Sequence, residues 1–208
     1  DPILKDSAAC ANTDIICGHI YGGGLAAYPL AESKGKEVWM TEHLSGENSN
    51  SNNWTWAINV ALEMNNVMNA GMNAYIWWYL VRYYGPICDG TNDCGIQGEI
   101  TKKGFVMSQF SKFIRPGFYR IECPSHAQSN IFLSAYKNST SEVVVVIINN
   151  GSTPKYQTVT LYNGDVNLVT PFTTSKKKNC EQGEDIFVRE GKFTVLVEPS
   201  SITTFVSN

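Results

Sequence analysis

The sequence predicts two regions of different fold class, an α/β region over residues 1–117 and an all-β region over residues 118–208. The first region alternates short apolar runs with amphipathic stretches, which is typical of βα units. The second region has short apolar runs separated by turn-forming residues and shows no helical period, which is typical of an antiparallel β-sandwich. The pattern changes at Arg115-Pro116-Gly117, where proline and glycine end a helical stretch.

Three strands and two helices are expected in the first region. Apolar runs predict strands at about residues 14–19, 37–42 and 73–79. From Trp54 to Ala70, apolar residues recur at spacings of three and four, and the pattern ends at Gly71, which predicts an amphipathic helix. A second helix is expected over residues 104–114, before Pro116.

The second region is expected to contain strands only. Apolar and β-branched runs alternate there with turn signals such as Asn149-Asn150-Gly151. The predicted strands are Ile131–Tyr136, Val143–Ile148, Tyr156–Tyr162, Val166–Val169, Phe193–Val197 and Ile202–Val206. The run Lys176-Lys177-Lys178 is interpreted as a solvated loop in preference to a binding patch.

One predicted strand ends in a carboxylate. In Val38-Trp39-Met40-Thr41-Glu42-His43 an apolar run delivers Glu42 to the carboxyl end of the strand. Barrels of the (β/α)₈ type, or TIM barrels, place their catalytic acids in this way. A glutamate just past a strand is more often a solvated loop residue, so the assignment of Glu42 as catalytic needs support from other segments.

A dense aromatic segment, residues 73–85, provides such support. It suits a buried barrel strand whose tip carries Trp78, Arg82 and Tyr84 into a cleft. Flat aromatic faces bind the C–H faces of sugars, and an arginine can bind a carboxylate with two parallel hydrogen bonds. The alternatives are a core strand with exposed aromatic residues at its rim, and an Arg82 that pairs with Asp89 and supports the loop.

Five segments, in order along nearly the whole chain, carry the motifs of one enzyme family. They are Gly18–Gly22, Val38–His43, Tyr75–Pro86, Lys103–Gly117 and Ser201–Val206. On these segments the chain resembles glycoside hydrolase family 30, and in particular its glucuronoxylanase branch. The resemblance implies the C-terminal part of a (β/α)₈ TIM barrel, containing the last three of eight strands, followed by an antiparallel β-sandwich side domain.

The resemblance also implies roles for individual residues. Glu42 matches the catalytic nucleophile, and Trp78 and Arg82 match positions that line the sugar subsites. Tyr21 is a candidate hydrogen-bond donor to Glu42, or a tyrosine that only packs at the rim. His19 is a candidate contact to sugar hydroxyls, or a core histidine. Tyr84 is expected beside Arg82 at the same tip, where Val81 replaces a second arginine found in many glucuronoxylanases.

The implied reaction is the retaining hydrolysis of β-1,4-xylan, with glucuronoxylan as the favoured substrate. The family's acid/base glutamate lies on the fourth barrel strand, and no second candidate occurs in this chain. An N-terminal chain of the same precursor is therefore expected to complete the barrel. The alternatives are another family 30 β-glycosidase, of the glucosylceramidase or β-1,6-glucanase type, and a catalytically incomplete carbohydrate-binding chain.

The cysteines and histidines are the residues that could form disulfides or bind a metal. The six cysteines are Cys10, Cys17, Cys88, Cys94, Cys123 and Cys180. They allow fifteen pairings. Local spacing favours Cys10 with Cys17 and Cys88 with Cys94, which leaves Cys123 with Cys180. Free thiols are the alternative. No C-x-x-C motif occurs and the histidines are scattered, so no metal or other cofactor is expected.

The composition of the chain indicates its cellular environment and excludes some classes of partner. Three N-x-S/T glycosylation sequons begin at Asn53, Asn138 and Asn150, and with the cysteines they favour a secreted, extracellular protein. The chain starts at Asp1-Pro2 without a signal peptide, which suggests processing of a longer precursor. A net charge of −3 argues against a nucleic-acid partner. No apolar stretch approaches about 18 residues, so no membrane span is expected.

Overall fold

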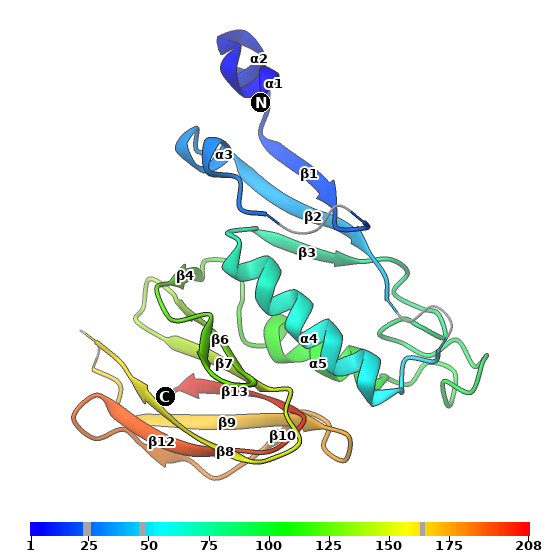
Figure 1. Cartoon of the computed structure of the whole chain (residues 1–208), viewed down its shortest axis with the longest axis vertical. Helices are drawn as coiled ribbons and strands as arrows, with labels where there is room; N and C mark the ends of the chain where they lie inside the picture. Colours follow the sequence, from blue (N-terminus) through cyan, green and yellow to red (C-terminus); the bar gives the residue numbers. More distant parts are fainter. Residues whose placement is uncertain (23–25, 46–48, 163–164) are drawn as a thin grey trace.

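The structure is a computed structural model that describes residues 1–22, 26–45, 49–162 and 165–208. In these residues the main elements stack in four layers, as Figure 1 shows: a three-stranded sheet, two helices, an eight-stranded sheet and a two-stranded sheet. The first two layers come from the predicted α/β region, and the last two from the predicted all-β region. The predicted fold class is thereby confirmed for the elements that the chain contains.

The three-stranded sheet is parallel, with the order β1-β2-β3. Its strands are β1 (Ile15–His19), β2 (Glu37–His43) and β3 (Ala74–Trp77), close to the predicted ranges. Three short helices were not predicted, namely α1 (Pro2–Lys5), α2 (Ser7–Ala11) and α3 (Pro29–Ser33). At four or five residues each, they are too short to show a helical period.

The helices of the second layer are α4 (Trp54–Asn69) and α5 (Lys102–Ser111). The Asn53 side chain caps α4 by accepting hydrogen bonds from the backbone N–H groups of Thr55 and Trp56. The Thr101 hydroxyl caps α5 by accepting from the N–H of Gly104. A Cβ at position 104 would lie 2.4 Å from the Pro86 carbonyl oxygen. Only glycine therefore lets α5 pack this closely against the loop that follows β3.

The remaining strands form the two antiparallel sheets. The eight-stranded sheet consists of β4 (Tyr119–Ile121), β5 (His126–Gln128), β6 (Ile131–Lys137), β7 (Val143–Asn149), β9 (Leu168–Ser175), β10 (Glu181–Gln182), β11 (Ile186–Phe187) and β13 (Ser201–Ser207). Its main path runs β10-β9-β13-β7-β6-β4, with β11 beside β9 and β5 beside β6. The two-stranded sheet pairs β8 (Lys155–Thr160) with β12 (Lys192–Val197).

The predicted strand Val166–Val169 was wrong in its bounds, because β9 runs from Leu168 to Ser175. The prediction stopped early since Pro171 and the threonines after it interrupt the apolar run. Pro171 is nevertheless paired opposite Phe205 within the ladder, and its carbonyl accepts a hydrogen bond from Gly183. The four short strands β4, β5, β10 and β11 have two or three residues each and were not predicted.

The central strands of the eight-stranded sheet are buried on both faces. Along β7, Val145 and Ile147 belong to the apolar core shared with β8 and β12, whereas Val146 and Ile148 belong to the core shared with α4 and α5. Side chains alternate between the two faces of a strand, so a strand covered on both faces is apolar throughout. The continuous apolar run in the sequence reflects this double burial.

Polar contacts fasten the helices to the eight-stranded sheet. Lys102 of α5 donates from Nζ to the carbonyl oxygens of Ser175 and Lys178 and to Oδ1 of Asn179, at 2.6–3.1 Å. Trp54 of α4 donates from Nε1 to the Ser200 hydroxyl at 2.8 Å. The two regions are therefore joined by directional bonds as well as by apolar packing.

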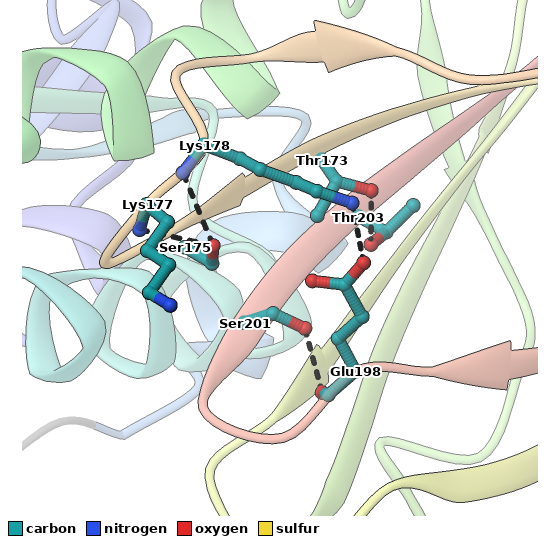
Figure 2. Close-up of polar contacts among 7 residues, drawn as sticks. All are labelled: Thr173, Ser175, Lys177, Lys178, Glu198, Ser201 and Thr203. Carbon is teal, nitrogen blue, oxygen red and sulfur yellow. Dashed lines mark hydrogen bonds and ion pairs between the residues drawn. The ribbon is translucent and has the colours of Figure 1, made fainter.

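The predicted lysine loop lies at this junction, and Figure 2 shows its contacts. Lys178 forms an ion pair with Glu198, while the Ser175 hydroxyl oxygen accepts from the backbone N–H groups of Lys177 and Lys178. Lys176 and Lys177 are exposed. The run is thus a solvated loop in which one lysine is already paired.

Candidate active site

Glu42 lies at the carboxyl end of the parallel sheet, beside residues from the neighbouring strand. The register between β1 and β2 shifts after Gly18, which brings His19 opposite Glu42. His19 Nδ1 lies 3.8 Å from Glu42 Oε1, and both side chains are partly exposed. The structure therefore brings the two predicted residues together at an accessible edge of the sheet.

Tyr21, just past β1, is the third member of this group. Its ring lies edge-on to His19, with ring centroids 6.0 Å apart. Partial burial, the charge of Glu42 and a side-chain hydrogen bond with Glu42 raise the pKa of Tyr21 above its usual value. The neutral hydroxyl is therefore favoured, and a neutral hydroxyl can donate a hydrogen bond to the carboxylate.

The tip that follows β3 carries exposed aromatic side chains. The Trp78 N–H donates to the His43 carbonyl at 2.9 Å, which places Trp78 next to the end of β2. Trp78 is 40% exposed and packs edge-on against Tyr79, with centroids 4.6 Å apart. Tyr79 adopts a left-handed backbone conformation with φ of 61°. Such strain in a non-glycine residue costs about 1–3 kcal/mol and is concentrated at functional sites.

Arg82 sits at the same tip and contacts two tyrosines. Its guanidinium carbon lies 5.3 Å from the centre of the Tyr79 ring. A side-chain hydrogen bond with Tyr84 is the main reason that the pKa of Arg82 is raised. Tyr84 is buried, and its charge is the smallest cause of the raised pKa of Tyr21. The five predicted partners of Glu42 thus cluster around one end of the sheet.

The alternative partner of Arg82 was Asp89. Asp89 instead accepts hydrogen bonds from the backbone and hydroxyl of Thr91, at 3.0 and 2.8 Å. The Thr91 hydroxyl bond is the first cause of the lowered pKa of Asp89, and the charge of Arg82 is the smallest of its causes. Within the described residues, Arg82 and Asp89 do not form an ion pair. Arg82 is exposed.

A disulfide closes the loop behind this tip. Cys88 and Cys94 are bonded, with Cα atoms 5.6 Å apart, and both are buried. Ile87 forms bridges with Val81 and with Ile100, so the loop folds back on the Arg82 segment. This predicted pairing is confirmed.

The other two favoured disulfides are wrong in this structure, where the remaining cysteines are free. Cys10 lies in helix α2, and the chain is extended from Ile15, so β1 carries Cys17 away from the helix. Cys123 follows β4, whereas Cys180 precedes β10, at the opposite edge of the eight-stranded sheet. With strands about 4.8 Å apart, that separation far exceeds the reach of a disulfide. Spacing along the chain does not reveal such separations.

Three residues of the site were missed by the sequence analysis. His43 Nδ1 lies 2.7 Å from Glu63 Oε1, and the Tyr75 hydroxyl donates to the same oxygen at 2.5 Å. Burial, followed by the charge of Glu63, raises the pKa of Tyr75 well above its usual value. One signal was available in the sequence: Glu63 is the single charged residue in the 16 residues of α4.

The sequence predicts no role for Lys103 beyond its place in a family motif. In the structure its side chain is fully buried beneath the site. Its Nζ donates to the carbonyl oxygens of Ser45 and Tyr84, at 2.5 and 3.3 Å, and lies 5.1 Å from the centre of the Trp77 ring. Ser45 follows β2 and Tyr84 follows β3. The buried ammonium group therefore ties together the two segments that carry Glu42 and Arg82.

The sequons occupy different settings. Asn53 is exposed at the start of α4, Asn150 is exposed after β7, and Asn138 is half-buried, donating from Nδ2 to Glu142 at 3.0 Å. Their glycosylation stays a prediction. Among the described residues, no group of three His, Cys, Asp or Glu side chains is placed to hold a metal ion. None of the described helices has the length and apolar character needed to cross a membrane.

The parallel βα units place a carboxylate at a strand end with aromatic residues around it, the arrangement that the sequence predicts for a glycoside hydrolase. Comparison with known proteins agrees. Residues 117–205 match the glycosyl hydrolase family 30 beta sandwich domain. The chain is 37% identical to glucuronoxylanase XynC of Bacillus subtilis (strain 168), and the match covers 100% of this chain and 49% of that protein.

Solved structures show the same relationship. The chain superposes on Xyn30A, a family 30 subfamily 8 xylanase from Clostridium acetobutylicum, with a TM-score of 0.89 at 35% identity, covering 100% of this chain and 52% of that one. For a GH30 endoxylanase from Clostridium papyrosolvens C71 the TM-score is 0.87 at 34% identity, with the same coverage. The chain is similar to these family 30 proteins over its whole length, as its motifs predict. It spans about half the length of the relatives it matches.

Proposed function

We propose that this chain is the C-terminal portion of a secreted, retaining endo-β-1,4-xylanase that acts on glucuronoxylan. The observation that carries the proposal is the grouping of Glu42 with His19 and Tyr21 at the carboxyl end of the parallel strands. The similarity to glucuronoxylanases over the whole chain supports the choice of substrate.

In this mechanism the Glu42 carboxylate attacks the anomeric carbon of a xylose unit. A glycosyl ester forms, the glycosidic bond breaks, and an acid/base glutamate from outside this chain protonates the leaving oxygen. Water, deprotonated by the same glutamate, then cleaves the ester with net retention of configuration. Retention requires the two carboxyl groups to lie about 5–5.5 Å apart. Tyr21 would hold the attacking carboxylate, and Trp78 would form the floor beneath the sugar.

The glucuronate side group is assigned to Arg82 and Tyr84. The accessible guanidinium can donate two parallel hydrogen bonds to a carboxylate, which a lysine cannot do. Tyr84 orients the guanidinium by the side-chain hydrogen bond described above. Arg82 therefore separates this proposal from the other family 30 specificities, because a β-1,6-glucan or a glucosylceramide offers no carboxylate at this place.

The partner proposed to complete the enzyme is an N-terminal chain of the same precursor. Two features of the described residues support it. β1 is an edge strand whose side chains are mostly exposed, and such an edge normally requires a cover. A groove of about 570 Å³ also opens between the β4–β6 end of the large sheet and β8, and apolar side chains such as Leu133, Val145 and Leu161 contribute to its lining.

The principal test is Glu42→Gln in the enzyme assembled with its N-terminal portion. Loss of the nucleophile should lower the turnover of glucuronoxylan by several orders of magnitude while the affinity for xylan stays nearly unchanged. The matched control is Glu37→Gln, at the other end of β2, where the carboxylate accepts a hydrogen bond from the Trp39 indole N–H at 2.7 Å. Undiminished hydrolysis by Glu42→Gln would show that another residue is the nucleophile.

The substrate assignment is tested by Arg82→Ala. A charge-assisted contact contributes roughly 1.5–3 kcal/mol, so kcat/KM on glucuronoxylan should fall about tenfold to a hundredfold. Linear, unsubstituted xylan has no carboxylate and should respond much less. Arg115→Ala, an exposed arginine at the end of α5, is the control. Equal losses on the two substrates would contradict recognition of glucuronate by Arg82.

A further inference from the structure

Behind Glu42 lies a polar cluster that the proposed mechanism does not use. It consists of His43, Glu63 and Tyr75, which come from β2, α4 and β3 respectively. Glu63 Oε1 receives both the His43 Nδ1 contact at 2.7 Å and the Tyr75 hydroxyl bond. The side chains of His43 and Glu63 are only 14% and 19% exposed. The cluster therefore lies between the sheet and the helix layer.

A carboxylate in this position is costly to bury, so its contacts are informative. A carboxylate accepts hydrogen bonds and does not donate them, so with Glu63 ionised the proton of the His43 ring is on Nδ1. The ring is then fixed in both tautomer and orientation, as is common where a histidine must be held in one pose. Tyr75 supplies the second donor that a half-buried carboxylate needs.

The fixed ring of His43 contacts Tyr21, a neighbour of Glu42 in the candidate site. The His43 and Tyr21 rings lie 4.8 Å apart at an angle of 43°. Tyr21 also lies edge-on to His19, whose Nδ1 is 3.8 Å from Glu42 Oε1, and the charge of Glu42 is one cause of the raised pKa of Tyr21. The backbone of His43 is also held in place, because its carbonyl oxygen accepts a hydrogen bond from the N–H of Trp78 at 2.9 Å. A change in the orientation of His43 would therefore reach Glu42 through Tyr21.

We propose that Glu63 is a positioning residue, which holds His43 against Tyr21 and so fixes the Glu42 carboxylate for attack. Glu63 acts without touching substrate. The inference rests on the proposed function, because it concerns the geometry of the nucleophile. Displacement of a reacting group by about 1 Å can cost up to a hundredfold in rate, so a residue behind the site can control turnover.

The test compares Glu63→Ala, Glu63→Gln and the control Asn66→Ala in the assembled enzyme. Asn66 is exposed on the same helix. An activated 2-fluoro xylobioside with a dinitrophenolate leaving group counts the competent sites, because the Glu42 carboxylate displaces the phenolate and stays esterified. Turnover is then expressed per labelled site, which removes the contribution of misfolded protein.

We expect Glu63→Ala to lower kcat per labelled site about tenfold to a hundredfold while KM changes less than about twofold. Glu63→Gln should recover part of the loss, because its amide oxygen still accepts from His43. Asn66→Ala should match the wild type. A purely structural role would reduce the labelled fraction or the melting temperature and leave kcat per site unchanged, which would overturn the inference alone. A wild-type enzyme without activity on any xylan would overturn the proposed function as well.

Discussion

Strands β7 and β1 show how differently the two regions of this chain depend on what surrounds them. Every residue of β7 is buried, because the strand lies inside the eight-stranded sheet with packed layers on both faces. In β1 only Ile16 is partly buried, and the strand has a single neighbour. The sandwich region therefore contains its own core, whereas the region that carries the candidate active site exposes much of the surface that a complete barrel would cover.

The same contrast occurs between the two faces of β3. Trp77 faces α4 and α5 and is 8% exposed, whereas Ile76 on the opposite face is 43% exposed. The helix side of β3 is thus covered, and its opposite side is open. His43 and Lys103, which contact Glu63 and the Tyr84 carbonyl respectively, are covered by the helix layer. This difference explains how three parallel strands can already bring Glu42 and its neighbours together.

The largest expected effect concerns local opening. In the chain alone, amide protons of β7 should exchange with solvent about a thousandfold more slowly than those of β1, because edge segments open with little free energy while core strands open only globally. Hydrogen exchange followed by mass spectrometry measures the difference. Adding the N-terminal portion should slow exchange in β1 at least about tenfold and leave β7 unchanged. Equal protection of both strands in the chain alone would remove the structural reason for a partner.

A matched pair of substitutions sharpens the comparison. Ile147 of β7 is fully buried, and Ile15 of β1 is 40% exposed. Ile147→Ala should lower the free energy of unfolding by about 2–5 kcal/mol, because it removes apolar contacts and leaves a cavity. Ile15→Ala should cost less than about 1 kcal/mol in the chain alone. Urea unfolding of both variants is the measurement. Similar costs at the two positions would mean that β1 is already packed.

The sequence predicted those parts of the fold that depend on local pattern. The apolar run Val143–Ile148 identified a strand, which is β7, and the spacing along α4 identified its apolar face. The bounds of β9 were missed, because the pairing of Pro171 with Phe205 is a tertiary constraint. The pairing of Cys123 with Cys180 was wrong because the order of strands in a sheet cannot be read from spacing.

The candidate site shows the same division. Glu42, Tyr21, Trp78 and Arg82 were predictable because each follows or ends a strand, and parallel strands bring their carboxyl ends together. Glu63 lies 21 positions after Glu42 on a helix, and only folding reveals that it contacts His43 and Tyr75. A residue that acts from behind a site has no strand-end signal, although a lone charge in an apolar helix is a reason to look for its partner.

The smallest expected effect is a dependence of stability on alkaline pH. Tyr136 of β6 is buried against the helix layer, and burial raises its pKa well above the usual value of about 10. The unfolded chain loses this proton above pH 10 while the folded chain keeps it. The stabilising contribution is therefore complete below pH 10 and declines as the pH rises, by up to about 1.4 kcal/mol per pH unit.

Substitution of Tyr136 by phenylalanine should remove this decline. In urea unfolding between pH 9 and about pH 11, the free energy of unfolding of Tyr136→Phe should fall less steeply than that of the wild type. Tyr162→Phe, at a position that is 84% exposed, should leave the slope unchanged. Tyr75→Phe tests the barrel side, because burial and Glu63 raise the pKa of Tyr75 in the same direction. If only Tyr136→Phe flattens the slope, Tyr75 is reached by solvent before the sandwich unfolds, and the two regions open separately.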